Sequence, residues 1–276
     1  MCGFIGFSGQ LAEKEAVLQR MMARIVHRGP DMGGAYTDED IALGFRRLSI
    51  LDLSEAGAQP MKSEDGNVVV TFNGEIYNFM ELRRELEEKG HHFHCHADTE
   101  VLVHGYEEWG TRLVHRLRGM YGFVIWDKAN RRLFGARDMF GIKPFYYSPL
   151  PGGKGLLFGS EIKGFLEHPL FEKAVNENAL LPYLTLQYSA TEETFFKGVY
   201  KLPAAHYFTY ENGKLDIQRY WDCEFAPKEQ SFDACADELD KAVHESVAAH
   251  RIADVKVGAF LSGGVDSSYI TACLMP

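Results

Sequence analysis

The sequence predicts an α+β protein with a first domain of layered sheets and helices, followed by the start of an α/β domain. Over most of the chain, short apolar runs rich in β-branched residues alternate with glycine-rich turns, and few helical stretches interrupt them. Near residue 230 the pattern changes to a long helix, a continuous apolar run, a Ser-Gly-Gly turn and a second helix start. Such an order is typical of a parallel sheet with crossover helices.

Length and composition fit one large globular domain or two ordinary ones, because the 276 residues are 46% hydrophobic and 25% charged. The formal charge of -10 argues against a surface that binds nucleic acid. The five cysteines are scattered and odd in number, which indicates a reducing compartment and no disulfide framework. No signal pattern or membrane-spanning stretch is present, so we expect a cytoplasmic protein without a membrane partner.

Hydrophobic periodicity assigns the elements of the first domain. A helix is expected over 13–26, where apolar residues recur every four positions, and a charged surface helix over 80–89. The expected strands are short apolar runs at 4–7, 41–45, 68–72, 121–126, 132–136, 156–159 and 206–210. The strands at 121–126 and 132–136 are expected to pair around the turn at 128–130.

The C-terminal part reads as a helix over 231–250, a buried strand over 255–261 and a second helix from about Asp266. The apolar face of the first helix is expected to carry Phe232, Leu239, Val243 and Val247. A linker is placed near 211–230, where Asn212-Gly213 indicates a hairpin turn. One strand does not make a parallel sheet, so we expect the natural protein to continue beyond residue 276.

The most distinctive feature is a cysteine at position 2, in the opening Met1-Cys2-Gly3. Removal of Met1 would give one residue both a thiol and a free α-amine, which titrate near about 8.5 and about 8. N-terminal nucleophiles use their own amine as the activating base. Cys2 is therefore a candidate nucleophile, although a free cysteine alone is more often a packing residue.

The turn over 262–268 joins the apolar run to a helix start and reads Ser-Gly-Gly-Val-Asp-Ser-Ser. Glycines allow close approach of the backbone to a ligand, and a helix N-terminus presents amide donors to an anion. The loop lacks the lysine of the common nucleotide-binding loop. We expect anion binding here rather than a plain capped turn.

Three further positions follow strands or precede helices. Asn73-Gly74 offers a side-chain amide and a backbone amide, the donors of an oxyanion hole, although the same pair is also a common hairpin turn. Arg47 in Arg46-Arg47-Leu48-Ser49-Ile50 can bind a carboxylate through two hydrogen bonds or remain solvated. Asp98 can hold an ammonium group or cap the next helix.

A histidine-rich run at 91–96 includes Cys95 and invites a metal-site interpretation. His92, His94 and His96 would share one face of a strand. Zinc sites usually draw ligands from two segments, and the sequence shows no second cluster. We therefore expect no metal site and interpret the run as surface histidines on an edge strand.

These motifs together resemble the family of glutamine-hydrolysing asparagine synthetases of the bacterial asparagine synthase B type, over essentially the whole chain. Besides Met1-Cys2-Gly3, Asn73-Gly74 and the 262–268 loop, the resemblance rests on the segments at 27–31, 47–50, 75–78, 98–100, 137–144 and 159–163. It implies a class II glutamine amidotransferase domain over 1–215, with the four-layer αββα sandwich of N-terminal-nucleophile hydrolases. It also implies the start of a PP-loop, ATP pyrophosphatase-type ATP-binding domain over 230–276.

The resemblance implies that Cys2 is the nucleophile and that Asn73 and Gly74 form the oxyanion hole. The implied glutamine-binding residues are Arg47, Leu48, Ile50, Asn73, Gly74, Glu75 and Asp98. The implied ATP-binding residues are Phe260, Ser262, Gly263, Gly264, Asp266 and Ser267. The complete protein would use ATP and Mg²⁺ to activate aspartate and would amidate it with ammonia from glutamine. A homodimer is left open.

Other functions stay open on the sequence. A relative with the same chemistry could amidate another carboxylate, because the acceptor pocket would lie beyond residue 276. A plain glutamine hydrolase would need no phosphate-binding loop. Cyclising relatives lack the N-terminal cysteine, and a non-catalytic module would be marked by loss of Cys2, Arg47 or Asn73, all of which are present.

Overall fold

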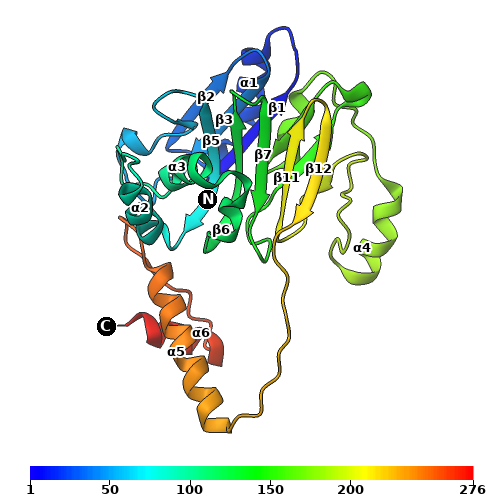
Figure 1. Cartoon of the computed structure of the whole chain (residues 1–276). Helices are drawn as coiled ribbons and strands as arrows, with labels where there is room; N and C mark the ends of the chain where they lie inside the picture. The colour runs from blue at the N-terminus through cyan, green and yellow to red at the C-terminus, as the bar shows by residue number, and fades with distance from the viewer. Residues whose placement is uncertain (276) are drawn as a thin grey trace.

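The computed structural model describes residues 1–275 and contains two six-stranded sheets with antiparallel strand pairing (Figure 1). The first sheet has the order β10 (Tyr200–Lys201), β8 (Tyr146–Pro149), β9 (Leu156–Gly159), β1 (Gly3–Ser8), β3 (Ile41–Arg47), β2 (Met32–Thr37). The second has the order β12 (Lys214–Arg219), β11 (His206–Glu211), β7 (Arg132–Arg137), β6 (Gly119–Asp127), β5 (Val68–Ile76), β4 (Met61–Lys62).

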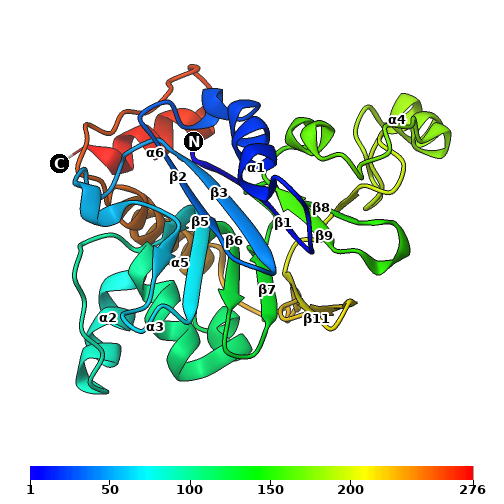
Figure 2. The same ribbon diagram turned by 90° about the horizontal axis from the view of Figure 1, so that it is seen from above.

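The two sheets lie face to face with helices on both outer sides, as Figure 2 shows. Helix α1 (Lys14–Ala23) packs on the first sheet, and α2 (Phe79–Glu88) and α3 (Thr99–Trp109) cover the second. One apolar core fills the space between the sheets and two others lie beneath the helices. The expected four-layer αββα sandwich is confirmed.

Short helices complete the first part of the chain. The α-helix α4 (Leu180–Leu186) lies beside the sandwich (Figure 1). The 3₁₀ segments are Val26–Arg28, Glu55–Gly57, Gly110–His115, Pro151–Gly153, Ile162–Glu167 and Glu177–Ala179. No helix in the described part of the chain is long and apolar enough to cross a membrane.

Most predicted elements are present, and the strands at 121–126 and 132–136 do pair around the expected turn. One strand is longer than predicted, because β5 continues past Phe72 to Ile76 and pairs with β6 along its whole length. Asn73-Gly74 therefore lies inside a strand and is no hairpin turn. The sequence pattern was misleading here because cross-strand pairing outweighs the turn preference of an Asn-Gly pair.

The edge strand predicted for the histidine run is wrong, because residues 91–96 form no strand. The segment crosses from α2 to α3 as irregular backbone, so His92, His94 and His96 do not share a strand face. Cys95 points inward instead and is buried, while those three histidines are exposed. The apolar contacts of Cys95 with the core beneath α2 and α3 explain why the segment follows the helices.

The C-terminal part consists of α5 (Phe232–His250) and α6 (Val265–Leu274), joined to β12 by an extended linker (Figure 1). Both helices were predicted, but the strand at 255–261 is wrong, because these residues are irregular and mostly exposed. In residues 1–275 no strand pairs with this run, and an unpaired strand is not stable in water. Phe232 and Leu239 on the expected apolar face are exposed, whereas Val247 is buried.

Helix α5 approaches the sandwich at its C-terminal end. The ring of His250 lies 4.3 Å from that of Tyr77, measured between centroids. The Asp254 amide donates to the carbonyl of Ile50 at 3.0 Å, and its carboxylate accepts from the Asp52 amide at 2.7 Å. Strand pairing in the second sheet continues through β12 to Arg219. The domain limits expected at residues 215 and 230 stay a prediction.

Candidate active site

Predicted site residues from four separate segments line one small cavity at an end of the sandwich. They are Cys2, Arg47, Leu48, Ile50, Gly74, Glu75 and Asp98. The cavity is also lined by Thr99 of the 98–100 motif and by residues that the sequence did not single out, which are Leu51, Gly57, Gln59, Phe72 and Ala97. The predicted Asn73 is not among the lining residues. The fold therefore brings together residues up to 97 positions apart in the chain.

Cys2 stands immediately before β1, half-buried at the cavity wall. The amide of Leu48 donates to its sulfur at 3.3 Å, and the thiol lies 3.4 Å from the Leu48 carbonyl. Burial raises the pKa of the thiol above its ordinary value. The Arg28 side chain donates to the Cys2 carbonyl at 2.9 Å and pairs with Glu161 at 3.1 Å, so two further motif residues anchor this end of the chain.

Gly74 occupies a special position in the sheet. It lies opposite Tyr121 of β6, whose amide and carbonyl are both bonded to Asp138. Tyr121 and Gly74 therefore form a non-hydrogen-bonded pair, and the amide of Gly74 points away from β6. A β-carbon at Gly74 would lie 2.2 Å from the Met120 carbonyl oxygen, so the position accepts only glycine without a backbone shift.

Three amides of alternate residues point to the same edge of β5. The amide of Phe72 donates to the Gln59 side chain at 2.6 Å, and that of Ile76 donates to the Asp98 carboxylate at 2.8 Å. The amide of Gly74 lies between them, faces the cavity, and has no hydrogen-bond partner among the described residues. The edge of β5 thus presents one free donor between two that are satisfied.

Asn73 supplies a second unused donor. Its side chain is 1% exposed, and its Nδ2 has no hydrogen-bond partner within residues 1–275. Side chains alternate along a strand, so Asn73 points to the same face as Val69, which packs between the sheets. Cys2 packs against this same inter-sheet core. Leaving a buried amide unpaired costs about 1–3 kcal/mol, which makes the position a candidate ligand-binding donor.

Arg47 is buried at the end of β3, and its guanidinium holds the loop that follows. It donates to the carbonyls of Ser54 at 2.8 Å and Leu51 at 3.1 Å, and also to that of Asp52. A guanidinium carries five N–H donors, so further ones remain for a ligand in the cavity. Arg47 is therefore a positioning residue for the 48–58 loop as well as a candidate carboxylate ligand.

Glu75, which is half-buried, and Asp98, which is buried, form an acidic pair in the cavity. Burial and the charge of Asp98 raise the pKa of Glu75, and Lys143 opposes this shift. Burial also raises the pKa of Asp98, although the Ile76 amide favours its charged form. Two carboxyl groups so placed keep a proton between them unless a cation enters.

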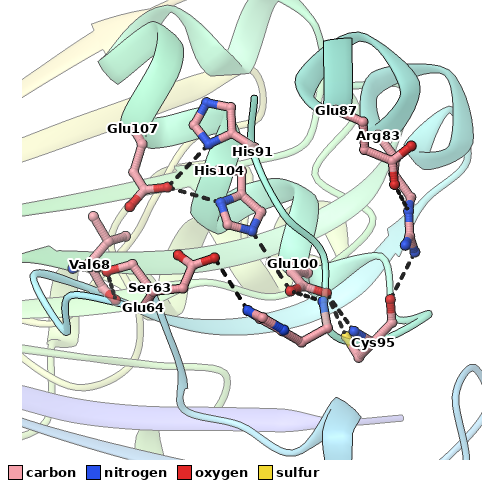
Figure 3. A network of polar contacts seen from close by, with 11 residues as sticks. Ser63, Glu64, Val68, Arg83, Glu87, His91, Cys95, Glu100, His104 and Glu107 are labelled. Atoms are coloured by element: carbon pink, nitrogen blue, oxygen red, sulfur yellow. Dashed lines mark hydrogen bonds and ion pairs between the residues drawn. The ribbon is translucent and has the colours of Figure 1, made fainter. Parts of the chain in front are cut away.

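A polar network holds the segment that leads to Asp98 (Figure 3). Glu100 accepts from the amides of His94 at 2.8 Å and Cys95 at 2.9 Å, and from the Cys95 thiol at 3.0 Å. Arg83 of α2 donates to the Cys95 carbonyl at 2.8 Å. Glu100, predicted within the Asp-Thr-Glu motif, thus supports the site from behind without lining its cavity.

The 262–268 loop lies on the exposed C-terminal part. Gly263 has a φ of +84°, and the hydroxyls of Ser262 and Ser267 are 2.9 Å apart. Gly264 caps α6, and Asp266 lies in the first turn of that helix. Phe260 is fully exposed. The hydroxyls and the free amides at the start of α6 fit a phosphate group, but no wall from the described residues encloses them.

Sequence reasoning missed Gln59, which is buried and bridges two elements. Its Oε1 accepts from the Phe72 amide and its Nε2 donates to the Thr99 hydroxyl at 3.1 Å. A glutamine in a loop carries no distinctive pattern, so no sequence signal identifies it. Arg28 and Glu161 belong to two segments that carry the family resemblance, 27–31 and 159–163, but neither residue was given a role in the site.

Comparison with known proteins agrees with this geometry. A family model for the glutamine amidotransferase domain matches residues 1–221, and a model for asparagine synthase matches residues 238–275. Asparagine synthetases [glutamine-hydrolyzing] 1 and 3 of Bacillus subtilis are 40% and 38% identical over 99% of this chain. The chain spans 43% and 45% of the length of these two relatives.

Glutamine phosphoribosylpyrophosphate amidotransferase from B. subtilis has a similar fold, with a TM-score of 0.60 at 16% identity. The match covers 99% of this chain and 64% of that one. The fold is thus that of the N-terminal-nucleophile amidotransferases, and the chain belongs to the glutamine amidotransferase domain family. The resemblance to glutamine-hydrolysing asparagine synthetases is also confirmed.

Proposed function

We propose that this chain hydrolyses glutamine to glutamate and ammonia at Cys2. The observation that carries the proposal is a pair of unused donors on neighbouring residues: the Gly74 backbone amide, in the cavity that Cys2 also lines, and the buried Asn73 side-chain amide, which has no hydrogen-bond partner among the described residues. A carbonyl oxygen that becomes negative on attack by sulfur requires such donors, already oriented. In an amidotransferase domain this arrangement fits acyl transfer.

The sulfur of Cys2 attacks the side-chain carbonyl carbon of glutamine, and the oxyanion is held by Asn73 and Gly74. The C–N bond breaks, the nitrogen takes a proton and leaves as ammonia, and a thioester remains. Water then attacks the thioester and releases glutamate and the thiol. The base is the α-amine of Cys2 itself, so the active form must have lost Met1.

Arg47 binds the α-carboxylate of glutamine through donors that the loop carbonyls leave free. The pair of Glu75 and Asp98 binds the α-ammonium, which supplies the cation that the two carboxylates require. Leu48 and Ile50 form the neighbouring wall of the cavity, and the Leu48 amide stabilises the Cys2 thiolate.

The whole protein is proposed to make asparagine from aspartate, ATP and the ammonia released at Cys2. Ser262, Gly263, Gly264 and Ser267 would hold the phosphates of ATP, and Asp266 would act through Mg²⁺. Phe260 would lie near the nucleotide once its segment is enclosed. The support is the family match over 238–275 and the names of the relatives.

A glutamate-release assay on the chain and its Cys2→Ala and Cys2→Ser variants tests the glutaminase. Wild type should release glutamate only after Met1 removal, shown by intact mass, and Cys2→Ala should be inactive. Activity in Cys2→Ala, or in material that keeps Met1, would contradict the mechanism. In longer protein that includes the remaining ATP-binding domain, ATP-dependent amidation of aspartate against other carboxylates identifies the acceptor.

A further inference from the structure

A cluster of nitrogen and oxygen ligands lies outside the candidate active site, where the α2–α3 connection meets α3. The side chains of His91, His104 and Glu107 bring one ligand atom each to within 4.8 Å of one another (Figure 3). His104 and Glu107 are three residues apart on α3 and share a face of the helix. His91 comes from the other segment, so the cluster has the two-segment origin typical of zinc sites.

The Glu107 carboxylate lies close to one ring nitrogen of each histidine. Glu107 Oε2 lies 2.9 Å from Nδ1 of His104 and 3.6 Å from Nδ1 of His91. Zinc bonds of about 2.0–2.2 Å in tetrahedral geometry separate ligand atoms by about 3.3–3.5 Å. The two separations from Glu107 are close to that range, and the third, between the two histidine nitrogens, is no more than 4.8 Å, so rotations that bring the two rings together would meet that geometry. His91 and Glu107 are partly exposed, so water can complete the coordination.

A further carboxylate lies near the second nitrogen of each histidine, just beyond hydrogen-bond distance. His104 Nε2 lies 3.7 Å from Glu100 Oε1, and His91 Nε2 lies 3.6 Å from Glu108 Oε2. Metal-bound histidines usually donate their other N–H to a carboxylate, which fixes the tautomer and directs the free lone pair to the metal. Here both rings direct Nδ1 toward Glu107 and Nε2 toward such a partner.

The carboxylates around His104 favour a positive charge in the site. His104 is 2% exposed and lies between Glu100 and Glu107.

We propose that His91, His104 and Glu107 bind one divalent transition-metal ion, with zinc the best match to two imidazoles, one carboxylate and a water. The metal would tie the 91–98 segment to α3 and so stabilise the position of Asp98. It would not contact glutamine, because none of its three ligands lines the cavity.

The test is calorimetric titration of chelator-treated, dialysed chain with zinc chloride in a buffer free of phosphate. One zinc per chain should bind saturably. His91→Ala and Glu107→Gln should each weaken binding at least about tenfold, since each removes a ligand without emptying the core. His92→Ala is the matched control, because His92 is exposed in the same segment and should leave binding unchanged.

Cobalt(II) gives a second readout. Visible absorption typical of a four-coordinate nitrogen and oxygen site should appear in wild type and disappear in Glu107→Gln. The melting temperature should rise with zinc in wild type and stay constant in His91→Ala. Absence of 1:1 zinc binding, equal loss in His92→Ala, or a thiolate-to-cobalt band from one of the cysteines would overturn the proposal.

Discussion

Asn73 and Gly74 are neighbours on one strand, yet their donors point in different directions from it. The side chain of Asn73 lies on the inter-sheet face, whereas the amide of Gly74 points to the strand edge. A hairpin turn would not hold two donors in this way. The extension of β5 past Phe72 is therefore what turns a common dipeptide into a candidate oxyanion hole.

Removing the Asn73 amide tests this role. Asn73→Ala should lower kcat by about 10²–10³ and leave KM within a few-fold, because the donor acts on the developing oxyanion. Thr71→Val is a matched control, since Thr71 also has a buried side-chain oxygen without a partner on the same face of β5 but lies further along the strand from Gly74, which lines the cavity. Steady-state glutamate release measures both. An Asn73 effect confined to KM would refute the assignment.

Substitution of Arg47 should affect KM more than kcat, the reverse of the result expected for Asn73. Arg47→Lys keeps the charge but loses the planar donors that hold the carbonyls of Leu51 and Ser54. We expect KM for glutamine to rise about tenfold or more, with a smaller change in kcat, because a carboxylate is bound equally in the ground and transition states. Hydrolysis measured over a range of glutamine concentrations separates the two constants, and an unchanged KM would exclude the role.

The pair of Glu75 and Asp98 predicts a pH-dependent affinity. Burial raises both pKa values, so the free site keeps a proton that the glutamine ammonium must displace. Affinity should be greatest above the raised pKa and fall up to about tenfold per pH unit below it. Calorimetry of glutamine binding to Cys2→Ala avoids titration of the thiol. In Asp98→Asn the slope should flatten, and a pH-independent wild type would contradict the prediction.

The loop over 48–58 is held from two sides. Arg47 binds its carbonyls from within, and Asp254 binds the amide of Asp52 and the carbonyl of Ile50 from the C-terminal part. Since Leu48 and Ile50 line the cavity, the segment after α5 is connected through this loop to the proposed glutamine site. The contact links two parts of the chain that the sequence treats separately.

Asp254→Ala should raise KM for glutamine several-fold and leave kcat nearly constant, because a charge-assisted hydrogen bond to the loop is lost. Asp254→Asn keeps an acceptor oxygen and should retain most of the affinity. Asp240→Ala is the control, since Asp240 binds the Tyr269 hydroxyl within the α5–α6 pair and does not touch the loop. Equal effects of the Asp254 and Asp240 substitutions on KM would show a general loss of packing instead.

His168 ends the turn over 162–167 and stacks edge-on against Phe7 of β1, with ring centroids 4.7 Å apart. Burial lowers its pKa to about 4. The unfolded chain takes up this proton near about pH 6.5, so the contribution of His168 to stability is fully present above that pH. As pH falls to 4 the free energy of unfolding should drop by up to about 3 kcal/mol from this group.

Urea unfolding at several pH values checks the expectation. His168→Phe keeps the stacking on Phe7 but cannot take up a proton, so its stability should fall less steeply between about pH 6.5 and 4. His92→Ala removes an exposed histidine and should follow wild type. Identical slopes in all three proteins would show that His168 does not drive the acid sensitivity.

The C-terminal part predicts a separation of activities in the chain as a whole. The cavity around Cys2 is walled by the sandwich, whereas the 262–268 loop and the run at 255–261 are exposed. This chain should hydrolyse glutamine but bind Mg-ATP too weakly to detect by calorimetry. Tight ATP binding by the 276-residue chain would show that the exposed loop is sufficient alone.

Cys2, Arg47, Gly74 and Asp98 could be predicted because motifs mark them, whereas Gln59 and the mutual geometry of the cavity residues could not. Local patterns do not show that β5 runs through Asn73, since this depends on pairing with β6. The strand expected at 255–261 is wrong for the same reason, because apolar content favours a strand only where neighbours exist. His104 and Glu107 were overlooked since only the fold brings His91 to them.

The edge of β5 acts as a molecular ruler. Alternate residues of a strand are about 6.6 Å apart, so the free amide of Gly74 stands that far from the Ile76 amide that anchors Asp98. In the proposed function the Gly74 amide holds the side-chain oxygen of glutamine, and the Asp98 carboxylate, fixed by the Ile76 amide, holds its ammonium. Asparagine is one methylene shorter, so we expect it to fit the two anchors less well than glutamine. The backbone of β5 would thus set the chain length of the preferred ligand.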